Sequence, residues 1–446
     1  MALKALDIFK LLPKTNCKKC GCPTCLAFAM KLAQKQATLD QCPDVSEASR
    51  AALDGAAAPP IRLVAIGAGP DKLEIGNETV LFRHDEAFYH APGIGVLLPD
   101  TLDERALAEA CAAIAGLRFT RVGMELKANV VAIENRSGAA EPFERTAAVV
   151  KQLGLPMVLM TAEAAHAERA VAVCAEARPL IHAATDANGE AMARVARDRK
   201  CPLAVAAPDL ERAAALAAMA RGAGVEDIVL DLTAAHTLDT LEALTASRRL
   251  ALKKKMRDLG YPAMVVVRAE DPLVNVADCC AFVAKYAGLV ITSLREPACL
   301  LPVLTVSQNL YTDPRKPIQV EAKLCPVGAV TPESPLLITT NFSLTFYTVE
   351  GEVEASRVPA YIGVIDTEGT SVLTAFASDK LTAEKVAAFL KSEDVTRQIK
   401  HRKVIIPGYL SAMSGALQEE SGWEVMVGPR EASGISRYLK TVWSGA

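Results

Sequence analysis

The chain has 446 residues, of which 51% are hydrophobic and 23% are charged, and its net charge is −3. This length predicts about two to four domains with sizeable buried cores. The balance of charges, with no basic tail, argues against a nucleic-acid-binding protein. The sequence has no uncharged apolar stretch of about 18 residues, so we expect no membrane span. Twelve cysteines without a secretion signal indicate a reducing, cytoplasmic compartment, where clustered thiols serve metal or redox chemistry.

The first predicted module covers residues 1–57 and contains five cysteines. A short amphipathic helix precedes the loop CKKCGCPTC at 17–25, and a second helix over 26–39 leads to a remote cysteine in DQCPD. Thiolates at this density can hold zinc or a [4Fe–4S] cluster. Zinc sites favour two well-separated CxxC pairs, whereas a compact loop with a distant Cys-Pro is more typical of a cubane cluster. The spacing does not show which of the five thiols is spare, Cys17, Cys20, Cys22, Cys25 or Cys42.

Residues 58–325 alternate short β-branched runs with alanine-rich helical stretches. Near-continuous apolar strands between amphipathic helices predict a parallel sheet that is buried on both faces. Eight such strands in this length match a (β/α)8 TIM barrel. An insertion over 79–98 should form a hairpin after the first strand. The eight predicted strands cover 62–69, 122–134, 156–161, 179–185, 202–207, 227–233, 263–269 and 288–293.

Residues 326–446 contain a second alternation, which starts near Leu336 and has a βαβαβα order. This order predicts a small α/β domain of Rossmann-like type, whose ligands bind beyond the carboxyl ends of the strands. Small residues follow three of these strands, in GTS at 369–371, PG at 407–408 and GP at 428–429. Such residues let a ligand approach the backbone closely.

Two proline-containing segments are predicted linkers between the domains. They are ALDGAAAPP over 52–60 and CPVGAVTPESP over 325–335. Because neither has a long apolar run, both should tether without packing, so that the end domains can move against the barrel.

The order of these features resembles the large (gamma) subunit of the corrinoid iron–sulfur protein of the anaerobic acetyl-CoA pathway. The cysteine spacing is Cys-x2-Cys-x4-Cys-x16-Cys, and a barrel and a small α/β domain follow it. The resemblance covers the whole chain, and the cysteine motif is its most specific part. It implies a [4Fe–4S] cluster on Cys17, Cys20, Cys25 and Cys42, which leaves Cys22 free.

The resemblance also implies a function. The family carries a methyl group on a corrinoid, a cobalamin, bound to the C-terminal domain. Its cobalt(I) accepts the methyl group from methyltetrahydrofolate through a separate methyltransferase and delivers it to acetyl-CoA synthase/carbon monoxide dehydrogenase. The barrel pairs with the barrel of a smaller subunit in a heterodimer, and the cluster returns cobalt(II) to cobalt(I). The chain is then a methyl carrier rather than a stand-alone enzyme, with no nucleic acid or membrane among its partners.

The corrinoid should lie over the strand ends of the C-terminal domain. None of the six histidines follows an aspartate by two residues, as it does in the Asp-x-His-x-x-Gly pattern of many cobalamin domains. We therefore expect no axial histidine and a base-off cobalt. The segment SVLTAF resembles the Ser-x-Leu stretch that packs against the nucleotide tail in other cobalamin domains. The expected contacts are Thr340, Phe346, Thr370, Ser371, Val372, Leu373, Thr374, Ser433 and Gly434.

Two other functions remain open on the sequence alone. Polar residues end several predicted barrel strands, where barrel enzymes place their chemistry, so the barrel could itself be a folate-dependent methyltransferase. They can equally cap helices and satisfy loops. The remaining alternative is an iron–sulfur electron-transfer or scaffold protein without corrinoid. The polar residues in question are Glu134, Asn135, Asp186, Asn188 and Asp231.

Overall fold

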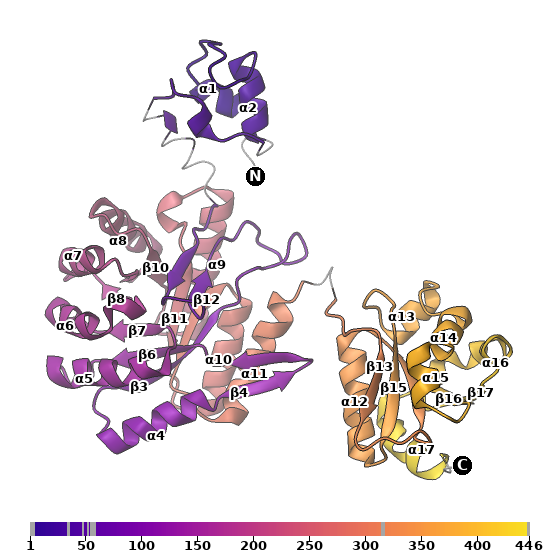
Figure 1. The fold of residues 1–446 in the computed structure, drawn as a ribbon. Helices are drawn as coiled ribbons and strands as arrows, with labels where there is room; N and C mark the ends of the chain where they lie inside the picture. The colour runs from indigo at the N-terminus through magenta and orange to yellow at the C-terminus, as the bar shows by residue number, and fades with distance from the viewer. Residues whose placement is uncertain are drawn as a thin grey trace. The chain divides into compact units, whose positions relative to one another are not determined.

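The computed structural model describes residues 5–33, 36–46, 49–50, 53, 59–313 and 317–443. They form two compact units. The first comprises the residues up to Arg118 and from Lys127 to Tyr311, and the second comprises Phe119–Leu126 together with the residues from Thr312 on. An N-terminal module and a barrel belong to the first unit, and the second is an α/β domain (Figure 1). No helix in these described ranges is long and apolar enough to cross a membrane.

The N-terminal module consists of two short helices and a 3-10 turn, α1 (Ala5–Leu11), α2 (Cys25–Ala33) and η1 (Leu39–Gln41). The helices pack against each other around a small core that includes Ile8, Leu12 and Phe28. Buried cysteines complete this core. The second helix predicted from the sequence is present but shorter than expected, and η1 leads the chain to Cys42.

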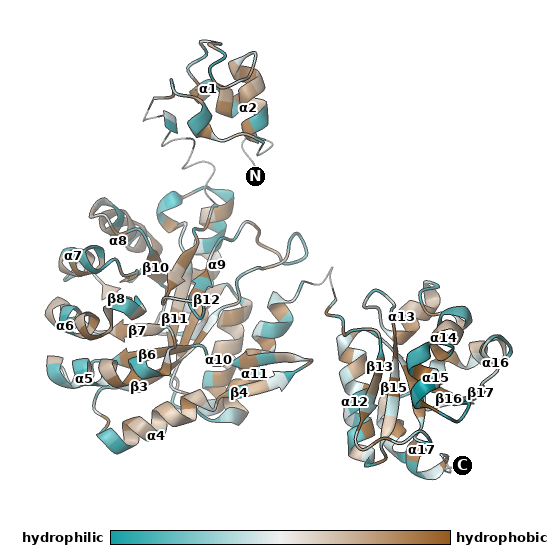
Figure 2. Ribbon diagram, in the orientation of Figure 1, coloured by the Kyte–Doolittle hydropathy of each residue, from teal (hydrophilic) through white to brown (hydrophobic). Residues whose placement is uncertain are grey.

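Eight parallel strands close into a barrel in the order β3-β6-β7-β8-β9-β10-β11-β12, with β12 paired to β3. A helix follows each strand, which confirms the predicted TIM barrel. The strands are almost wholly buried, and Figure 2 shows hydrophobic residues concentrated on them. The strands are β3 (Gly93–Pro99), β6 (Val130–Glu134), β7 (Met157–Met160), β8 (Leu180–Ala184), β9 (Leu203–Ala206), β10 (Ile228–Asp231), β11 (Ala263–Val267) and β12 (Ala287–Thr292). The helices are α4 (Glu104–Ala115), α5 (Ala140–Val150), α6 (Ala164–Cys174), α7 (Gly189–Arg199), α8 (Leu210–Gly222), α9 (Thr237–Lys253), α10 (Pro272–Ala284) and α11 (Pro297–Tyr311).

The first barrel strand is not the one predicted. The apolar run at 62–69 forms β1 (Val64–Ile66), which pairs antiparallel with β2 (Leu73–Ile75) outside the barrel. The first barrel strand is β3, which lies within the segment predicted to be a hairpin insertion. The predicted strand over 122–134 is also divided, into β6 and β5 (Met124–Lys127), which pairs with β4 (Arg118–Arg121).

Close packing at the barrel's amino-terminal end explains this difference. A Cβ atom on Gly93 would lie 2.5 Å from Leu73 Cδ2 and 2.8 Å from Leu289 Cδ1. The first residue of β3 therefore has to be a glycine, because the β1–β2 hairpin packs its own apolar residues into the same core. The hairpin closes the amino-terminal end and leaves the carboxyl ends of the strands to the βα loops.

The C-terminal domain is a five-stranded sheet in the order β13-β15-β14-β16-β17. Four strands are parallel, and β13 is antiparallel at one edge. One hydrophobic core lies on each face of this sheet. The strands are β13 (Leu324–Val327), β14 (Leu336–Thr340), β15 (Ala360–Ile365), β16 (Lys403–Ile406) and β17 (Glu424–Val427). The helices are α12 (Ser343–Ser356), α13 (Val372–Ala377), α14 (Ala383–Leu390), α15 (Glu393–Gln398), α16 (Ser414–Ser421) and α17 (Ile435–Thr441), with 3-10 turns η5 (Gly408–Met413) and η6 (Ala432–Gly434).

The first three residues of the predicted linker over 325–335 belong to this sheet. Cys325 pairs with Ile362 and Val327 with Ala360, so β13 begins before the predicted boundary at 325/326 and belongs to the C-terminal domain. The sequence signal was misleading because Pro326 lies within β13, an edge strand, where proline is tolerated. The other predicted linker, over 52–60, lies mostly outside the described residues.

Candidate functional site

The N-terminal module brings four of its five cysteines close together. Burial raises the pKa of the Cys42 thiol; a backbone hydrogen bond from Asp44 opposes this, and the charges of Cys20, Cys17 and Cys25 raise it further. Cys17, Cys20 and Cys25 therefore lie within electrostatic reach of Cys42, although Cys42 is remote from them in sequence. Such a set of soft sulfur ligands suits an iron–sulfur cluster.

A [4Fe–4S] cluster and a single zinc ion require different arrangements of four thiols. Among the described residues, no three Cys, His, Asp or Glu side chains converge tightly enough to bind one ion. Zinc requires four sulfurs about 2.3 Å from the same atom. A [4Fe–4S] cubane takes one thiolate on each of four different irons, so its ligands stand farther apart.

Asn16 is a site residue that the sequence reasoning missed. Its Oδ1 accepts a hydrogen bond from the backbone N–H of Cys25 at 2.8 Å, and its own N–H donates to Cys25 Sγ at 3.3 Å. Asn16 has a left-handed backbone with φ of +49°, which asparagine tolerates better than most residues. Hydrogen bonds to ligand sulfurs tune the potential of iron–sulfur clusters. The sequence feature that could have identified it is an asparagine directly before the first cysteine of the motif.

An ion pair joins the two ends of the cysteine motif. Lys19 Nζ lies 2.9 Å from Asp44 Oδ1, which connects the loop to the segment after Cys42. The hydrogen bond from Lys19 lowers the pKa of Asp44, and a hydrogen bond with Cys17 lowers it further. By contrast, Cys22 is only 3% exposed and packs with Ile8 in the core of the module.

A cavity opens at the carboxyl ends of the C-terminal strands. β14 and β16 are paired through a single register position, Leu337 with Ile405, so the two strands diverge beyond it. The chain goes from β14 to β15 on one side and then to β16 on the other, which makes this gap the topological switch point of the sheet. The cavity there has a volume of about 110 Å³ and is mostly apolar, with Val349, Val372 and Tyr438 among its lining residues.

Large apolar side chains are exposed on the segments that follow these strand ends. Leu344 and Leu373 are each 51% exposed, Val427 is 40% exposed and Tyr409 is 39% exposed. They begin α12 and α13, follow β16 and end β17, so they are contributed by all four parallel strands. An apolar rim around an apolar cavity fits a large, flat, partly buried ligand.

Two buried hydroxyls at the end of β14 have no hydrogen-bond partner in the described structure. They are Thr339 Oγ1 and Thr340 Oγ1, and both side chains are fully buried. An unsatisfied buried hydroxyl costs about 1–3 kcal/mol, so a ligand that supplies a polar group here would recover that free energy. Thr339 lines the cavity directly. A corrinoid carries amide side chains, which suit this position chemically.

Asn341 holds the loop between β15 and α13. Its Oδ1 accepts hydrogen bonds from the backbone N–H groups of Thr367 and Gly369, both at 3.0 Å. This contact places Thr370 and Ser371 at the start of α13, beside the cavity-lining Val372. The loop is therefore held by the residue that directly follows β14.

The predicted corrinoid contacts fall into three groups. Val372 lines the cavity. Its neighbours in sequence, on the same loop and helix, are Thr370, Ser371, Leu373 and Thr374. Thr340 and Phe346 are buried, and Phe346 packs in a core with its neighbour Tyr347. Ser433 is exposed, and a Cβ atom on Gly434 would lie 2.7 Å from Pro429 Cβ. The sequence reasoning missed the cavity-lining Ile405, Ile406 and Arg430, whereas Pro407 and Pro429 belong to the PG and GP segments expected to approach a ligand.

No histidine is among the residues that line the cavity. His401, the histidine closest in sequence to β16, has its Nε2 2.8 Å from the carbonyl oxygen of Ser334 and packs its ring against Trp443. It precedes the amino end of β16 and so stands at the opposite end of the strand from the cavity. The cavity residues offer cobalt no imidazole.

The five polar residues predicted at the barrel's carboxyl end all have partners on neighbouring side chains or backbone. Glu134 forms an ion pair with Arg268 at 2.7 Å, and because β3 and β12 separate their strands, this pair crosses part of the barrel mouth. Asp231 lies 2.6 Å from His182 Nε2. The remaining three also have partners, with Asn135 donating to Asp100, Asp186 paired to Arg212 and Asn188 accepting from Thr185. These contacts favour a structural role over a substrate site.

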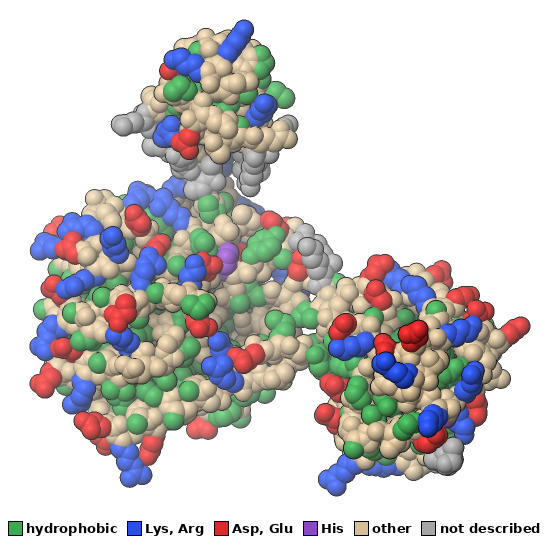
Figure 3. All heavy atoms as spheres, in the orientation of Figure 1, with side chains coloured by type: hydrophobic (Ala, Val, Ile, Leu, Met, Phe, Trp, Pro, Cys, Tyr) green, Lys and Arg blue, Asp and Glu red, His purple; other side chains and the backbone are tan. Residues whose placement is uncertain are grey.

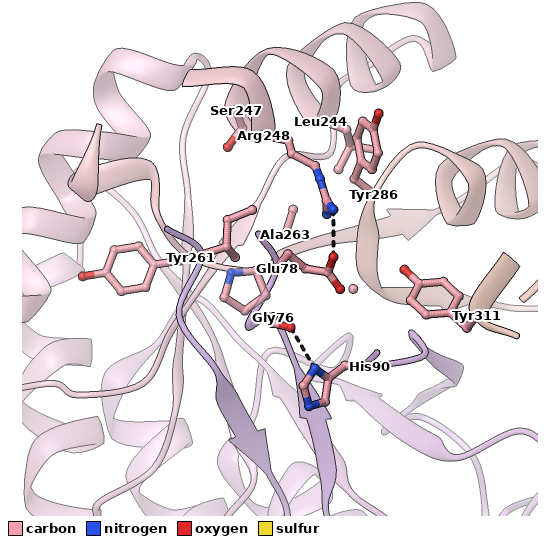
Figure 4. Close-up of a pocket in the computed structure, with 13 residues that line it drawn as sticks. Gly76, Glu78, His90, Leu244, Ser247, Arg248, Tyr261, Ala263, Tyr286 and Tyr311 are labelled. Carbon is pink, nitrogen blue, oxygen red and sulfur yellow. Dashed lines mark hydrogen bonds and ion pairs between the residues drawn. The ribbon is translucent and has the colours of Figure 1, made fainter. Parts of the chain in front are cut away.

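A small polar pocket lies near the barrel's amino-terminal end (Figure 4). Its volume of about 30 Å³ is enough for about one water molecule. Arg248 of α9 donates to Glu78 at 2.8 Å, and its guanidinium lies over the rings of Phe88 and Tyr286. Burial raises the pKa of Glu78, and the charge of Arg248 opposes that shift. This pair fastens the segment after β2 to α9.

Comparison with known proteins agrees with this architecture. The family model of the CO dehydrogenase/acetyl-CoA synthase delta subunit matches residues 63–439, and a model described as a putative Fe-S cluster matches residues 12–43. The barrel and the C-terminal domain are thus similar to that delta subunit, and the cysteine module lies outside the match.

Full-length relatives are more specific. The corrinoid/iron-sulfur protein large subunit of Moorella thermoacetica is 46% identical over 441 residues, which cover 99% of each chain. The acetyl-CoA decarbonylase/synthase complex subunit gamma of Methanothermobacter thermautotrophicus is 36% identical over 98% of this chain and 99% of that protein. A dihydropteroate synthase structure from Thermus thermophilus aligns with 56% of this chain at 18% identity and a TM-score of 0.40, which is too weak to indicate an activity. The chain therefore belongs to the family of large (gamma) subunits of the corrinoid iron–sulfur protein of the acetyl-CoA synthase/carbon monoxide dehydrogenase system.

Proposed function

We propose that this protein is a methyl-group carrier with a corrinoid in its C-terminal domain and a [4Fe–4S] cluster in its N-terminal module. The observation that carries the proposal is the apolar cavity at the switch point of the C-terminal sheet, with exposed apolar side chains around it. It occurs on the same chain as a module that gathers four thiols. A cluster that transfers single electrons and a site for a large ligand then occur on one chain. This combination suits a cofactor that must be reduced before it reacts.

In this proposal the chain's own residues bind and orient the corrinoid. When bound, the corrinoid supplies the cobalt that accepts the methyl group from methyltetrahydrofolate through a methyltransferase and gives it to acetyl-CoA synthase. Leu344, Leu373, Tyr409 and Val427 would exclude water from the face toward the domain. Thr339 would hydrogen bond to a polar group that enters the cavity.

The absence of an imidazole among the cavity residues supports a base-off cobalt. A corrinoid held there without a nitrogen donor from the protein would supply a cobalt(II) that is easier to reduce. The cluster held by Cys17, Cys20, Cys25 and Cys42 would supply the electron for this reactivation, which occurs outside normal turnover.

The partners in this proposal are a smaller barrel subunit, the methyltransferase and acetyl-CoA synthase/carbon monoxide dehydrogenase. The relatives named above are themselves subunits of an acetyl-CoA decarbonylase/synthase complex or of a corrinoid protein, which supports such an assembly.

Metal analysis and electron paramagnetic resonance test the proposal together. We expect about one cobalt and about four irons per chain, with a cobalt(II) spectrum of base-off type that lacks nitrogen superhyperfine splitting. Clear splitting from an axial nitrogen would contradict the base-off site. Iron without cobalt would support the scaffold alternative, and methyl transfer to free cobalamin by this chain alone would support the barrel methyltransferase.

A further inference from the structure

Residues 318–323, which we call the entry strap, precede β13 and lie beside the residues that directly follow β14. Gln319 forms an antiparallel bridge with Phe342. The backbone N–H of Val320 donates to the carbonyl oxygen of Asn341 at 2.9 Å. The entry strap is therefore held against the turn between β14 and α12, at the end of the sheet where the cavity opens.

The side chain of Gln319 reaches the loop between β15 and α13 through Asn341. Gln319 Oε1 accepts a hydrogen bond from Asn341 Nδ2 at 3.1 Å, and the same nitrogen donates to Asp366 Oδ1 at 2.9 Å. Asn341 Oδ1 accepts from the backbone N–H groups of Thr367 and Gly369. Asn341 is only 3% exposed, and both ends of its amide are engaged. A buried amide thus connects the entry strap to the loop.

Gln319 also packs directly against the backbone of that loop. A Cβ atom on Gly369 would lie 2.7 Å from Gln319 Cγ, so the glycine allows a close approach. Gly369 has a left-handed φ of +71°, and Glu368 before it has a φ of +56°. A non-glycine residue in this conformation costs free energy and persists because surrounding contacts hold it. The contact with Gln319 is one of those that hold this turn.

The loop in turn sets the position of α13. This helix has only 6 residues, and the side chain of its N-cap Ser371 makes no capping hydrogen bond. A helix this short is marginal by itself, so its position depends on its packing and on the loop before it. Its first residue, Val372, lines the cavity, and Leu373 is exposed on the rim. Loosening the loop would therefore displace residues that face the ligand.

We propose that Gln319 is a positioning residue for the corrinoid. Through Asn341 and Gly369 it holds the loop before α13, so that Val372 is in place before the ligand arrives. The inference rests on the proposed function, in which the cavity of the C-terminal domain binds a corrinoid. A loop that is ordered in advance loses less conformational freedom on binding, so it binds more tightly. The segment that leads the chain into this domain thus sets the affinity of a site that it does not line.

The test compares the full-length wild type with Gln319→Met and Gln319→Glu. Methionine can keep the packing against Gly369 but cannot accept the hydrogen bond from Asn341, whereas glutamate retains an acceptor oxygen. Hydrogen-exchange mass spectrometry of the cofactor-free chain measures the protection of the loop, and a spectroscopic titration measures the affinity for cobalamin. For Gln319→Met we expect roughly 2- to 10-fold faster exchange and roughly 2- to 10-fold weaker binding, the effect of one lost hydrogen bond.

The glutamate variant should restore both properties. A carboxylate oxygen accepts a hydrogen bond at least as well as an amide oxygen, so Gln319→Glu should stay within about twofold of the wild type. Figure 3 shows acidic and basic side chains mixed over the visible face of the C-terminal domain, so one added carboxylate joins a surface that already carries both signs of charge.

Gln418→Met is the matched control in the same domain. Gln319 and Gln418 are both exposed, and Gln418 Oε1 accepts a hydrogen bond from the backbone N–H of Val425 at 3.4 Å. Because Gln418 lies on α16 and Val425 on β17, this variant should leave the exchange of the loop and the affinity for cobalamin at the wild-type values.

The outcomes separate the positioning role from other effects. Unchanged exchange of the loop in Gln319→Met would overturn the connection through Asn341, and faster exchange with unchanged affinity would overturn the role in corrinoid binding. Equal weakening by Gln418→Met would also overturn it, because a general loss of stability would then be the cause. A wild-type chain that binds no cobalamin would instead contradict the proposed function, and the exchange data would decide separately whether Gln319 holds the loop.

Discussion

Cys22 and Cys25 lie three residues apart and are both buried, but their surroundings differ. Cys25 Sγ accepts a hydrogen bond from the backbone N–H of Asn16 at 3.3 Å. Cys22 packs against apolar residues that include Ile8 and Phe28. A ligand sulfur carries negative charge, so the hydrogen bond to Cys25 Sγ suits a ligand; the apolar packing itself is shared, because Cys22, Cys25 and Cys42 all belong to this core. Sequence spacing could not make this distinction, because it contains no information about which way a side chain faces.

The first prediction follows from that contrast. Cys22→Ala should retain about four irons per chain, because it removes a thiol that packs in the core, whereas Cys42→Ala should lose the intact cluster. Iron analysis and the visible absorption of the purified variants measure both. The assignment would be wrong if Cys22→Ala lost its iron and Cys25→Ala kept it.

The second prediction concerns Thr339, whose buried hydroxyl has no partner in the described structure. Thr339→Val replaces it with an apolar group of the same shape, so the cofactor-free protein should be as stable as the wild type or more stable. Cobalamin should bind about tenfold more weakly, since one lost hydrogen bond is worth about 1–1.5 kcal/mol. Thermal unfolding of the cofactor-free chain and a spectroscopic titration measure the two effects. An unchanged affinity for cobalamin would show that the hydroxyl does not contact the cofactor.

At the level of elements, the number of barrel strands was predictable and the identity of the first was not. The runs at 62–69 and 93–99 are both short and apolar, so periodicity cannot rank them. Tertiary packing decides which run enters the barrel: β3 carries Gly93 where the barrel is tightly packed, and β1 has no glycine within the strand. The cavity beyond β14 could not be predicted from the sequence either, because it depends on two strands that diverge after one paired position.

The buried Arg248–Glu78 pair gives the third prediction. Removing one partner of a buried ion pair leaves the other charge unpaired and typically costs about 3–5 kcal/mol. Arg248→Met should therefore lower the unfolding temperature of the barrel strongly, and it also removes two cation–π contacts with Phe88 and Tyr286. The double variant with Glu78→Gln should recover part of the loss, because no buried charge then remains. Calorimetry of the barrel transition measures the series, and equal losses in the single and double variants would contradict this account.

The same site predicts a pH dependence with a definite sign. Burial raises the pKa of Glu78 above its ordinary value, so between the two values the folded chain binds more protons than the unfolded chain. The contribution of this group to stability is then fully present below the unfolded pKa and is lost as pH rises through the folded one. Without Arg248 to oppose the shift, Arg248→Met should lose less stability at about pH 5 than at about pH 8. The reverse order would show that another group dominates.

At the level of the whole molecule, the C-terminal unit has what an independent domain needs. Its sheet has a hydrophobic core on each face, and β13 contributes Leu324 to one core and Val327 to the other. The cavity, the apolar rim and the unpartnered threonines are all built from residues beyond Thr312. In the proposed function the cofactor would meet a methyl donor, a methyl acceptor and a reductant in turn, and a separable unit suits that role.

The last prediction tests this separability and the position of β13. A fragment of residues 312–446 should unfold cooperatively and bind cobalamin with the affinity of the full chain. A fragment of residues 336–446 lacks β13, so it should lose apolar contacts in both cores and expose the edge of β15. We expect it to aggregate or to bind cobalamin at least tenfold more weakly, by about 1.4 kcal/mol or more. Equal behaviour of the two fragments would make β13 dispensable and restore the boundary drawn at 325/326. Binding by the full chain but by neither fragment would mean that residues before 312 complete the site.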